Sequence, residues 1–303
     1  MKTIKKIVVA TDFSENANAA FEYARHLATS TGAVLHIIHV FTPPIPDSQQ
    51  EIYTNVPIFE ELVEIANERL ARFANEATKQ NDAVALAHPL KITYKTHVGF
   101  SPSAIIEASK DPSVDLVVLG AKGSGNWVDR AIGSVADAVG RKAHCPVLIV
   151  PHQAKYKGIQ RIVYGASGDS ARQKAIGTTL DWAKYFHASV HFVHVETPEE
   201  RDFGKTDYLF ALKADVTAPS VQHTVETIKS PSILEGLKKY ADKKAANLIV
   251  AVTKERSFWQ RLTHHSTTHD LVWHNDLPLL IMHQDDHYPP PPHTVEALLA
   301  HSL

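Results

Sequence analysis

Residues 115–123, Asp-Leu-Val-Val-Leu-Gly-Ala-Lys-Gly, join an apolar strand to a glycine-rich turn, and Gly133-Ser134 follow after nine intervening residues. A helical stretch from Ser134 to Arg141 comes next. Glycines after a strand let the backbone pass close to a ligand, and amides at a helix N-terminus face an anion. The spacing is too wide for a Walker A loop and differs from the dinucleotide-binding fingerprint. An ordinary glycine-rich turn between strand and helix is the alternative interpretation.

The N-terminal residues predict the same kind of sheet. Residues 5–10 form a short apolar strand, which Thr11-Asp12-Phe13-Ser14, a helix over 17–30 and a second strand over 33–40 follow. Strands this apolar are covered by helices on both faces, so the sequence predicts an α/β fold with a parallel sheet. In such sheets ligands bind beyond the carboxyl ends of strands, at the topological switch point. Asp12, Val40 and Gly120 each stand at such an end.

The chain also repeats itself. Residues 6–12 answer to 161–167, residues 34–40 to 189–195, and residues 115–150 run without a gap against 247–282. The two halves are therefore interpreted as tandem copies of one domain, joined by a polar connector from Pro151 to Gly158. We predict a first domain over 1–152, a second over 159–284 and a tail over 285–303. The tail contains a run of prolines and is expected to be a disordered terminus, with docking on a partner as the alternative.

These motifs resemble the universal stress protein family. The shared features are a first strand that ends in Thr11-Asp12, a second that ends in His39-Val40, and the glycine motif before Cys145-Pro-Val-Leu-Ile-Val150. The repeat extends the resemblance to the tandem, two-domain type. It implies two flavodoxin/Rossmann-like domains, each a five-stranded parallel sheet flanked by helices, related by pseudo-two-fold symmetry. It also implies that the ligand is ATP, with or without Mg²⁺.

The resemblance assigns roles to the residues of the first half. Thr11 and Val40 would contact adenine, while Asp12 would bind the ribose hydroxyls or help to hold a metal ion. A helix N-cap at Asp12 is the alternative. Ala10 and Leu119 would line the base pocket or merely end their strands. The loop and the following helix start would bind ribose and phosphates through Gly120, Lys122, Gly123, Gly133, Ser134 and Val135.

The second half departs from this pattern where the ligand would bind. Val252, Glu255 and His265 stand at the positions of the three glycines, and Ser167 stands at that of Asp12; only Ser134 is kept, as Ser266. Side chains would crowd the backbone there, and a carboxylate would repel phosphates. We therefore predict one ATP site per chain, with the second half as a scaffold; a new ligand in that half is the alternative.

Other reactive side chains predict no catalytic centre. His264, His265 and His269 cluster in the altered loop, and the last two have the spacing of a zinc-binding helix. A third ligand is not evident, so surface histidines and no metal site are predicted. Cys145 is expected to be a small core thiol. Without a Ser-His-Asp order or paired carboxylates, the sequence favours binding over catalysis. The resemblance then implies an ATP-binding regulator, with a slow ATPase or nucleotide-transferring enzyme as the alternative.

Composition is that of an ordinary globular protein. The 303 residues suggest two domains, and the net charge of -2 provides no electrostatic footprint for nucleic acid or an acidic membrane. One cysteine excludes an internal disulfide framework. The first apolar run is too short for a signal peptide, and no segment approaches a membrane span. We expect a cytoplasmic stress-response protein with an unidentified protein partner.

The last strand of each copy predicts how the halves meet. Residues 147–150 and 279–282 are short and apolar, and each follows a proline. An exposed apolar edge invites pairing with another strand. Single-domain members of the family that the chain resembles pair their last strands across a two-fold axis. We predict that the two strands run antiparallel within one chain, so that a homodimer, if one forms, uses another surface.

Overall fold

A computed structural model of the protein describes residues 4–42, 56–79, 88–123, 132–166, 173–198, 220–253 and 277–283. The elements of the first half are β1 (Lys6–Thr11), α1 (Glu15–Thr31), β2 (Val34–Phe41), α3 (Val56–Lys79), β3 (Lys91–Val98), α4 (Ser101–Ala108), β4 (Leu116–Gly120), α5 (Ser134–Lys142) and β5 (Val147–Val150). Those of the second half are β6 (Arg161–Ala166), α6 (Gln173–Phe186), β7 (Ser189–Glu196), β8 (His223–Lys229), α8 (Ile233–Lys243), β9 (Leu248–Thr253) and β10 (Leu279–His283).

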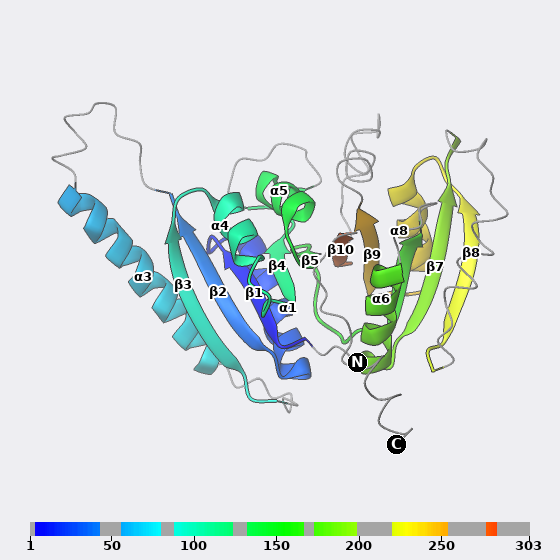
Figure 1. Ribbon diagram of the computed structural model, residues 1–303, viewed down its shortest axis with the longest axis horizontal. Helices are drawn as coiled ribbons and strands as arrows, with labels where there is room; N and C mark the ends of the chain where they lie inside the picture. Colours follow the sequence, from blue (N-terminus) through cyan, green and yellow to red (C-terminus); the bar gives the residue numbers. More distant parts are fainter. Residues whose placement is uncertain are drawn as a thin grey trace, which may run out of the picture.

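The described strands form one ten-stranded sheet in the order β3-β2-β1-β4-β5-β10-β9-β6-β7-β8 (Figure 1). All neighbours within a half are parallel. Each half has the Rossmann order 3-2-1-4-5 rather than the flavodoxin order 2-1-3-4-5. The predicted α/β fold of two five-stranded parallel sheets is confirmed. The domain limits 1–152 and 159–284 stay a prediction, and the tail 285–303 lies outside the described residues.

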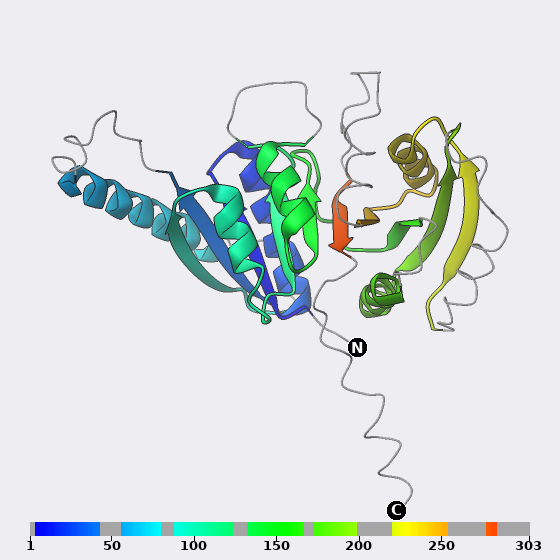
Figure 2. The same cartoon turned by 45° about the horizontal axis from the view of Figure 1, so that its top comes forward.

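Helices cover both faces of the sheet because its strands are apolar on both sides. Along β1, Ile7 and Val9 face one core, which α1, α3 and α6 complete, whereas Val8 faces a second core. The second core is completed by α4, α5 and α8. Figure 2 shows α4 and α5 on one side of the first half, and α6 and α8 on opposite sides of the second. Burial of apolar surface on both faces is the main stabilising term of this architecture.

The two halves meet through β5 and β10. Their pairing is antiparallel, with Leu279 opposite Ile149, Leu280 opposite Leu148 and Ile281 opposite Val147. All six side chains are at most 2% exposed. This pairing confirms the antiparallel contact that the sequence predicts. Because the strand order reads alike in both directions from this pair, the two halves have the expected pseudo-two-fold relation.

The connector between the halves packs against both of them. The hydroxyl of Tyr156 lies 2.9 Å from Ser30 Oγ on α1, and its ring contacts Tyr23 edge to face at 5.1 Å. From the other half, the Tyr185 hydroxyl on α6 donates to the carbonyl oxygen of Ser30 at 3.2 Å. One turn of α1 therefore contacts both the connector and the second half.

The repeat extends to individual hydrogen bonds. Asp115 Oδ2 accepts bonds from the amides of Lys5 and Lys6 at 2.8 and 3.2 Å. Asn247 Oδ1 accepts the equivalent pair, from Gln160 and Arg161, both at 3.1 Å. The first strand of each half is thus tied to the start of the fourth by the same side-chain position.

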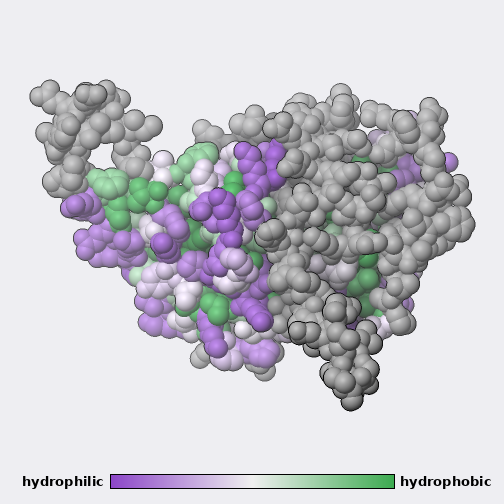
Figure 3. Space-filling view, in the orientation of Figure 1, coloured by the Kyte–Doolittle hydropathy of each residue, from purple (hydrophilic) through white to green (hydrophobic). Residues whose placement is uncertain are grey.

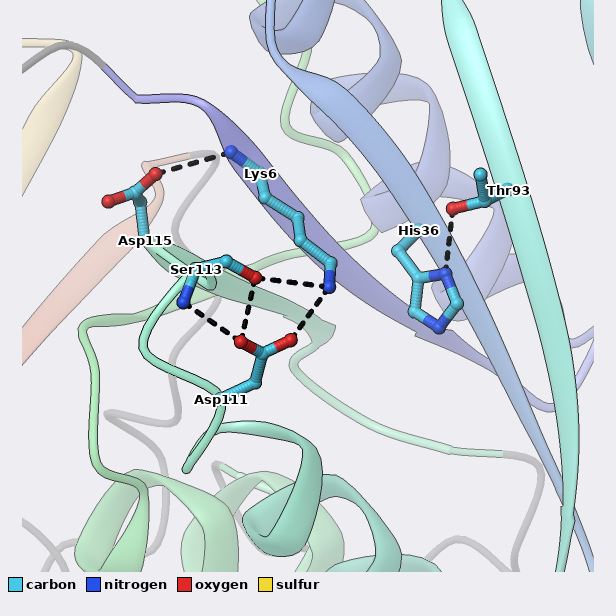
Figure 4. Close-up of polar contacts among 6 residues, drawn as sticks. All are labelled: Lys6, His36, Thr93, Asp111, Ser113 and Asp115. Atoms are coloured by element: carbon cyan, nitrogen blue, oxygen red, sulfur yellow. Dashed lines mark hydrogen bonds and ion pairs between the residues drawn. The ribbon is translucent and has the colours of Figure 1, made fainter.

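A polar cluster lies at the amino ends of the first-half strands (Figure 4). Lys6 Nζ donates to Asp111 Oδ2 at 2.8 Å, and the amide of Ser113 donates to Asp111 Oδ1 at 2.9 Å. The bond from Lys6 is the main reason that the pKa of Asp111 is lowered. His36 Nδ1 lies 2.8 Å from Thr93 Oγ1, and burial followed by the charge of Lys6 lowers the pKa of His36.

The described surface carries few large apolar side chains. In Figure 3, the coloured part of the visible surface is largely hydrophilic, and hydrophobic residues gather near the outer end of α3. Within the described ranges, the exposed large apolar residues lie along the outer edge formed by α3, β3 and the start of α4: Phe59, Ile65, Tyr94, Val98 and Phe100. No described helix has both the length and the apolar character needed to cross a membrane.

A glutamate in the central strand pair should separate the halves. Ile149 is fully buried opposite Leu279, so Ile149→Glu places a carboxylate in an apolar core and should lower the free energy of unfolding by more than about 3 kcal/mol. The exposed edges should then make the variant aggregate or dimerise, measured by light scattering and limited proteolysis. Tyr94→Glu on the outer strand, where the residue is 45% exposed, is the matched control. An Ile149→Glu protein as compact and monomeric as the parent contradicts the interface.

Stability should fall as the pH drops below neutral. The pKa values of His36, His97 and His191 are all lowered from 6.5, chiefly by burial. The unfolded chain therefore binds more protons below that pH. The stability that these histidines contribute is complete above 6.5 and is lost as the pH falls from there through their lowered pKa values. Urea unfolding between about pH 7 and pH 5 should show a shallower decline for His36→Gln than for the parent. Identical slopes would show that the local environment of His36 is not the cause.

Candidate functional site

The carboxyl ends of β1 and β4 meet at the topological switch point of the first half. The chain leaves β1 toward β2 and β3 on one side, while β4 and β5 lie on the other. Two helices begin at this edge, α1 after β1 and α5 after the glycine loop. Helix N-termini carry partial positive charge and unpaired amides, so two of them at one edge favour a negatively charged ligand.

The described ends of the glycine loop, at Gly120 and Gly133, pack backbone against backbone. A Cβ on Gly120 would lie 2.8 Å from the carbonyl oxygen of Asn16 in the first turn of α1. The amide of Gly133 donates to the carbonyl of Ala121 at 2.8 Å, and a Cβ on Gly133 would lie 3.3 Å from Lys122 Cα. Gly120 was expected to admit ribose and phosphates, but the close approach of α1 already requires a glycine there.

Asp12 lies over the same loop. A Cβ on Gly123 would lie 3.2 Å from Asp12 Oδ2, while Asp12 Oδ1 accepts a bond from the amide of Ser14 at 3.0 Å. The alternative role of Asp12 as a helix N-cap is wrong, because Ser14 is the N-cap of α1 and its Oγ accepts from the amide of Ala17. Asp12, Lys122 and Gly123 are all exposed, so one carboxylate, one amine and an open backbone face solvent together.

The start of α5 presents its amides without a side-chain cap. Gly133 is the N-cap residue, and its lack of a side chain leaves no capping hydrogen bond. Ser134 is the exposed first residue, and Val135 follows it half-buried. Uncapped amides at a helix start need water or a ligand as partner. The predicted phosphate-binding positions therefore lie beside Asp12 and the loop.

Three of the four residues predicted to contact or line the base share one face of the sheet: Ala10, Val40 and Leu119. Leu119 is 4% exposed and belongs to the core beneath α4 and α5. Ala10, Val40 and Val135 are half-buried and pack against that same core, as does Ile132, which the sequence did not indicate. Together they form a partly exposed apolar surface next to the polar loop. The hydroxyl of Thr11 is turned inward and accepts a bond from the amide of Phe13 at 3.0 Å.

Two residues of this region were missed from the sequence. Phe13 has φ of +61°, which is unusual for a residue with a side chain, and it turns the chain from β1 into α1. His39 donates from Nδ1 to the carbonyl oxygen of Thr11 at 2.9 Å, and its ring lies 4.6 Å from that of Phe13. An apolar residue directly between Asp12 and Ser14 was the available signal.

The second half keeps the same scaffold, but the carboxyl ends of its strands are covered where those of the first half are partly exposed. His194 Nδ1 contacts the carbonyl oxygen of Ala166 at 3.1 Å, as His39 does in the first half. At the position of Ala10 stands Gly165, where a Cβ would lie 2.8 Å from Leu237 Cδ1 on α8. Val195, the counterpart of Val40, is only 3% exposed. The helix thus packs directly onto the strand ends, where the first half leaves apolar side chains partly exposed.

Several predictions for the second half fall on residues that the structure does not describe. They concern Ser167, Glu255, His264, His265, Ser266 and His269. Val252 is described, and it is 9% exposed in the core beneath α6. Among the described ranges, no group of three or more histidine, cysteine or acidic residues is arranged to hold a metal ion.

Comparison with known proteins relates each half to one family. Residues 3–151 and 158–283 each match the universal stress protein family. A universal stress protein of Thermus aquaticus is 31% identical over 151 residues, which are 48% of this chain and 98% of that protein. One of Mycobacterium tuberculosis is 26% identical over 198 residues and 62% of each chain. A solved universal stress protein of Archaeoglobus fulgidus shares the fold, with a TM-score of 0.68, 17% identity and coverage of 92% of this chain and 98% of its own.

The packing of Gly120 can be tested apart from any ligand. Gly120→Ala should lower the free energy of unfolding by about 1–3 kcal/mol, because the added Cβ meets a backbone carbonyl rather than a flexible side chain. Gly177→Ala in α6, with no atom within 4 Å of the new Cβ, should instead gain about 0.5–1 kcal/mol. Urea denaturation of both variants measures the difference. Equal effects would mean that α1 does not restrict position 120.

Proposed function

The chain belongs to the universal stress protein family, and from that premise we propose that its first half binds one adenine nucleotide, ATP, and that the protein acts as a cytoplasmic regulator of the stress response. The two matched segments also motivate the assignment of a nucleotide-binding domain to residues 1–152 and a second domain to residues 159–284. The observation that carries the proposal is the meeting of Asp12, the glycine loop and the uncapped start of α5 at the switch point.

The polar side of this edge suits a phosphate chain. In the proposed complex the amides of Ser134 and Val135 donate to phosphate oxygens, and the dipole of α5 favours their charge. Gly123 lets the ligand approach the backbone closely, and the exposed amine of Lys122 offsets negative charge. The Asp12 carboxylate accepts bonds from ribose hydroxyls, or contacts Mg²⁺ if the ion accompanies the nucleotide.

The apolar side suits a purine base. Ala10, Val40 and Val135 offer partly exposed apolar surface beside the loop, with Leu119 buried beneath. In the proposed complex, Thr11 and Val40 contact adenine, and the backbone at the end of β2 reads the edge of the base. A planar base that covers these side chains would remove them from water. This apolar burial would add to the binding free energy that the charged loop supplies.

We place a single site on each chain. In the second half Leu237 occupies the region above Gly165, and Val195 is buried, so a base has no comparable apolar surface to contact. The sequence adds Glu255 in place of Gly123, which would bring a carboxylate toward the phosphates. This half is proposed to act as a scaffold that holds the binding half through β5 and β10.

Calorimetric titration of the full chain with ATP should give about one site. Gly123→Glu introduces the residue found at the equivalent position of the second half. It should abolish binding, because the added Cβ would lie 3.2 Å from Asp12 Oδ2 and the new carboxylate would repel the phosphates. Gly177→Glu makes the same chemical change at an open position of α6 and should bind as the parent does. A stoichiometry of two, or binding that Gly123→Glu leaves intact, contradicts the proposed site.

A further inference from the structure

Phe13 is held by three side chains from two other elements, β2 and α3. Its ring lies 4.6 Å from His39 on β2 and 5.6 Å from Phe73 on α3. The guanidinium carbon of Arg69, also on α3, lies 4.1 Å from the centre of the same ring. A cation over an aromatic face at this distance is attracted by the ring quadrupole. The residue next to Asp12 is therefore fixed by contacts with a helix that lies at the outer edge of the sheet.

The backbone at Phe13 is held in a conformation that it does not prefer. Its φ of +61° lies in the left-handed region, which a bulky side chain adopts only when its surroundings impose it. Hydrogen bonds fix both sides of the residue: the Phe13 amide to Thr11 Oγ1, and the Ser14 amide to Asp12 Oδ1. The ring contacts add the constraint that keeps this turn in one arrangement. Asp12 takes its direction from that arrangement.

The second half lacks this ring. The histidine bond is present in both halves, through His39 and His194, so it belongs to the common scaffold. The residue that corresponds to Phe13 in sequence is Gly168, which can enter the left-handed region without strain and has no side chain to hold. The aromatic contact thus accompanies the half that has the glycine loop.

We propose that Phe13 is a positioning residue of the nucleotide site, and that Arg69 of α3 acts on the site through the Phe13 ring. This inference rests on the proposed function. With the ring held, the Asp12 carboxylate stays over Gly123, where it meets the ligand without first having to be ordered. Loss of the ring leaves the chemical groups of the site in place but adds an ordering cost to binding.

A double-mutant cycle on the full chain tests this assignment by ATP titration. Phe13→Gly should raise the Kd by about tenfold, and Phe13→Tyr, which keeps the ring, should stay within about twofold of the parent. Arg69→Ala should raise the Kd by about threefold. The double variant should bind no more weakly than Phe13→Gly alone, because Arg69 without the ring has nothing to act on.

Stability measurements separate positioning from a general loss of structure. The ligand-free melting temperature should change little in Arg69→Ala, since the residue is exposed. In Phe13→Gly, relief of the left-handed backbone conformation at this position should offset part of the lost packing. Lys244→Ala removes a similar contact, with Tyr240 at 5.3 Å in the second half, and should leave the Kd unchanged. These results together support the proposal.

Three outcomes overturn it. An unchanged Kd in Phe13→Gly shows that the ring does not position the site. Additive effects in the double variant show that Arg69 acts on binding independently of Phe13. A weaker Kd in both single variants that is matched by a large fall in the ligand-free melting temperature shows a purely structural role. If the parent itself binds no adenine nucleotide, the proposed function is wrong and the positioning role falls with it, a result visible before any variant is measured.

Discussion

The pairing of β5 with β10 is the contact on which the rest of the molecule depends. Each half ends in a short apolar strand that would otherwise leave a row of unpaired amides and carbonyls at a hydrophobic edge. Joined antiparallel, the two strands complete one another's hydrogen bonds and close the cores on both faces of the sheet. The edge proposed as the binding site of the first half is thereby built on a strand, β4, whose neighbour β5 cannot shift without disturbing the other half.

The two halves show that, on this fold, a small change in helix packing distinguishes a closed core from the partly open strand ends where a ligand is proposed to bind. Strand order and the histidine bond are the same in both halves, and the same side-chain position, Asp115 or Asn247, ties the first strand to the fourth. The difference is the distance between a helix and the strand ends. Gly165 and Gly236 let α8 come so close to β6 and β7 that added Cβ atoms would meet Leu237 and Val195. Where Ala10 stands instead of Gly165, apolar surface stays partly open.

Much of this architecture could be predicted from the sequence because it follows from local patterns. Apolar strands and an internal repeat predicted the parallel sheets and their correspondence, and the terminal strands predicted their own pairing. The glycine motif predicted the edge at which Asp12 and the start of α5 meet. The sequence could not predict why Gly120 must be glycine. A nearby ligand and the carbonyl of Asn16 would each leave no room for a Cβ at this position, so the pattern is the same for both. Phe13 was missed because its role depends on side chains from β2 and α3, which are distant in sequence.

Ser30 and Tyr185 occupy equivalent places in the two halves, since Tyr185 follows Arg161 at the same interval as Ser30 follows Lys6. They nevertheless touch, and they do so as unlike residues, with the tyrosine hydroxyl donating to the serine carbonyl. Two identical subunits around a true axis could place only like residues at such a self-facing position. Covalent fusion removed that restriction, so each copy became free to evolve a surface fitted to the other rather than to itself. The same freedom allows α8 to close the strand-end edge of one half while the corresponding edge of the other stays partly open.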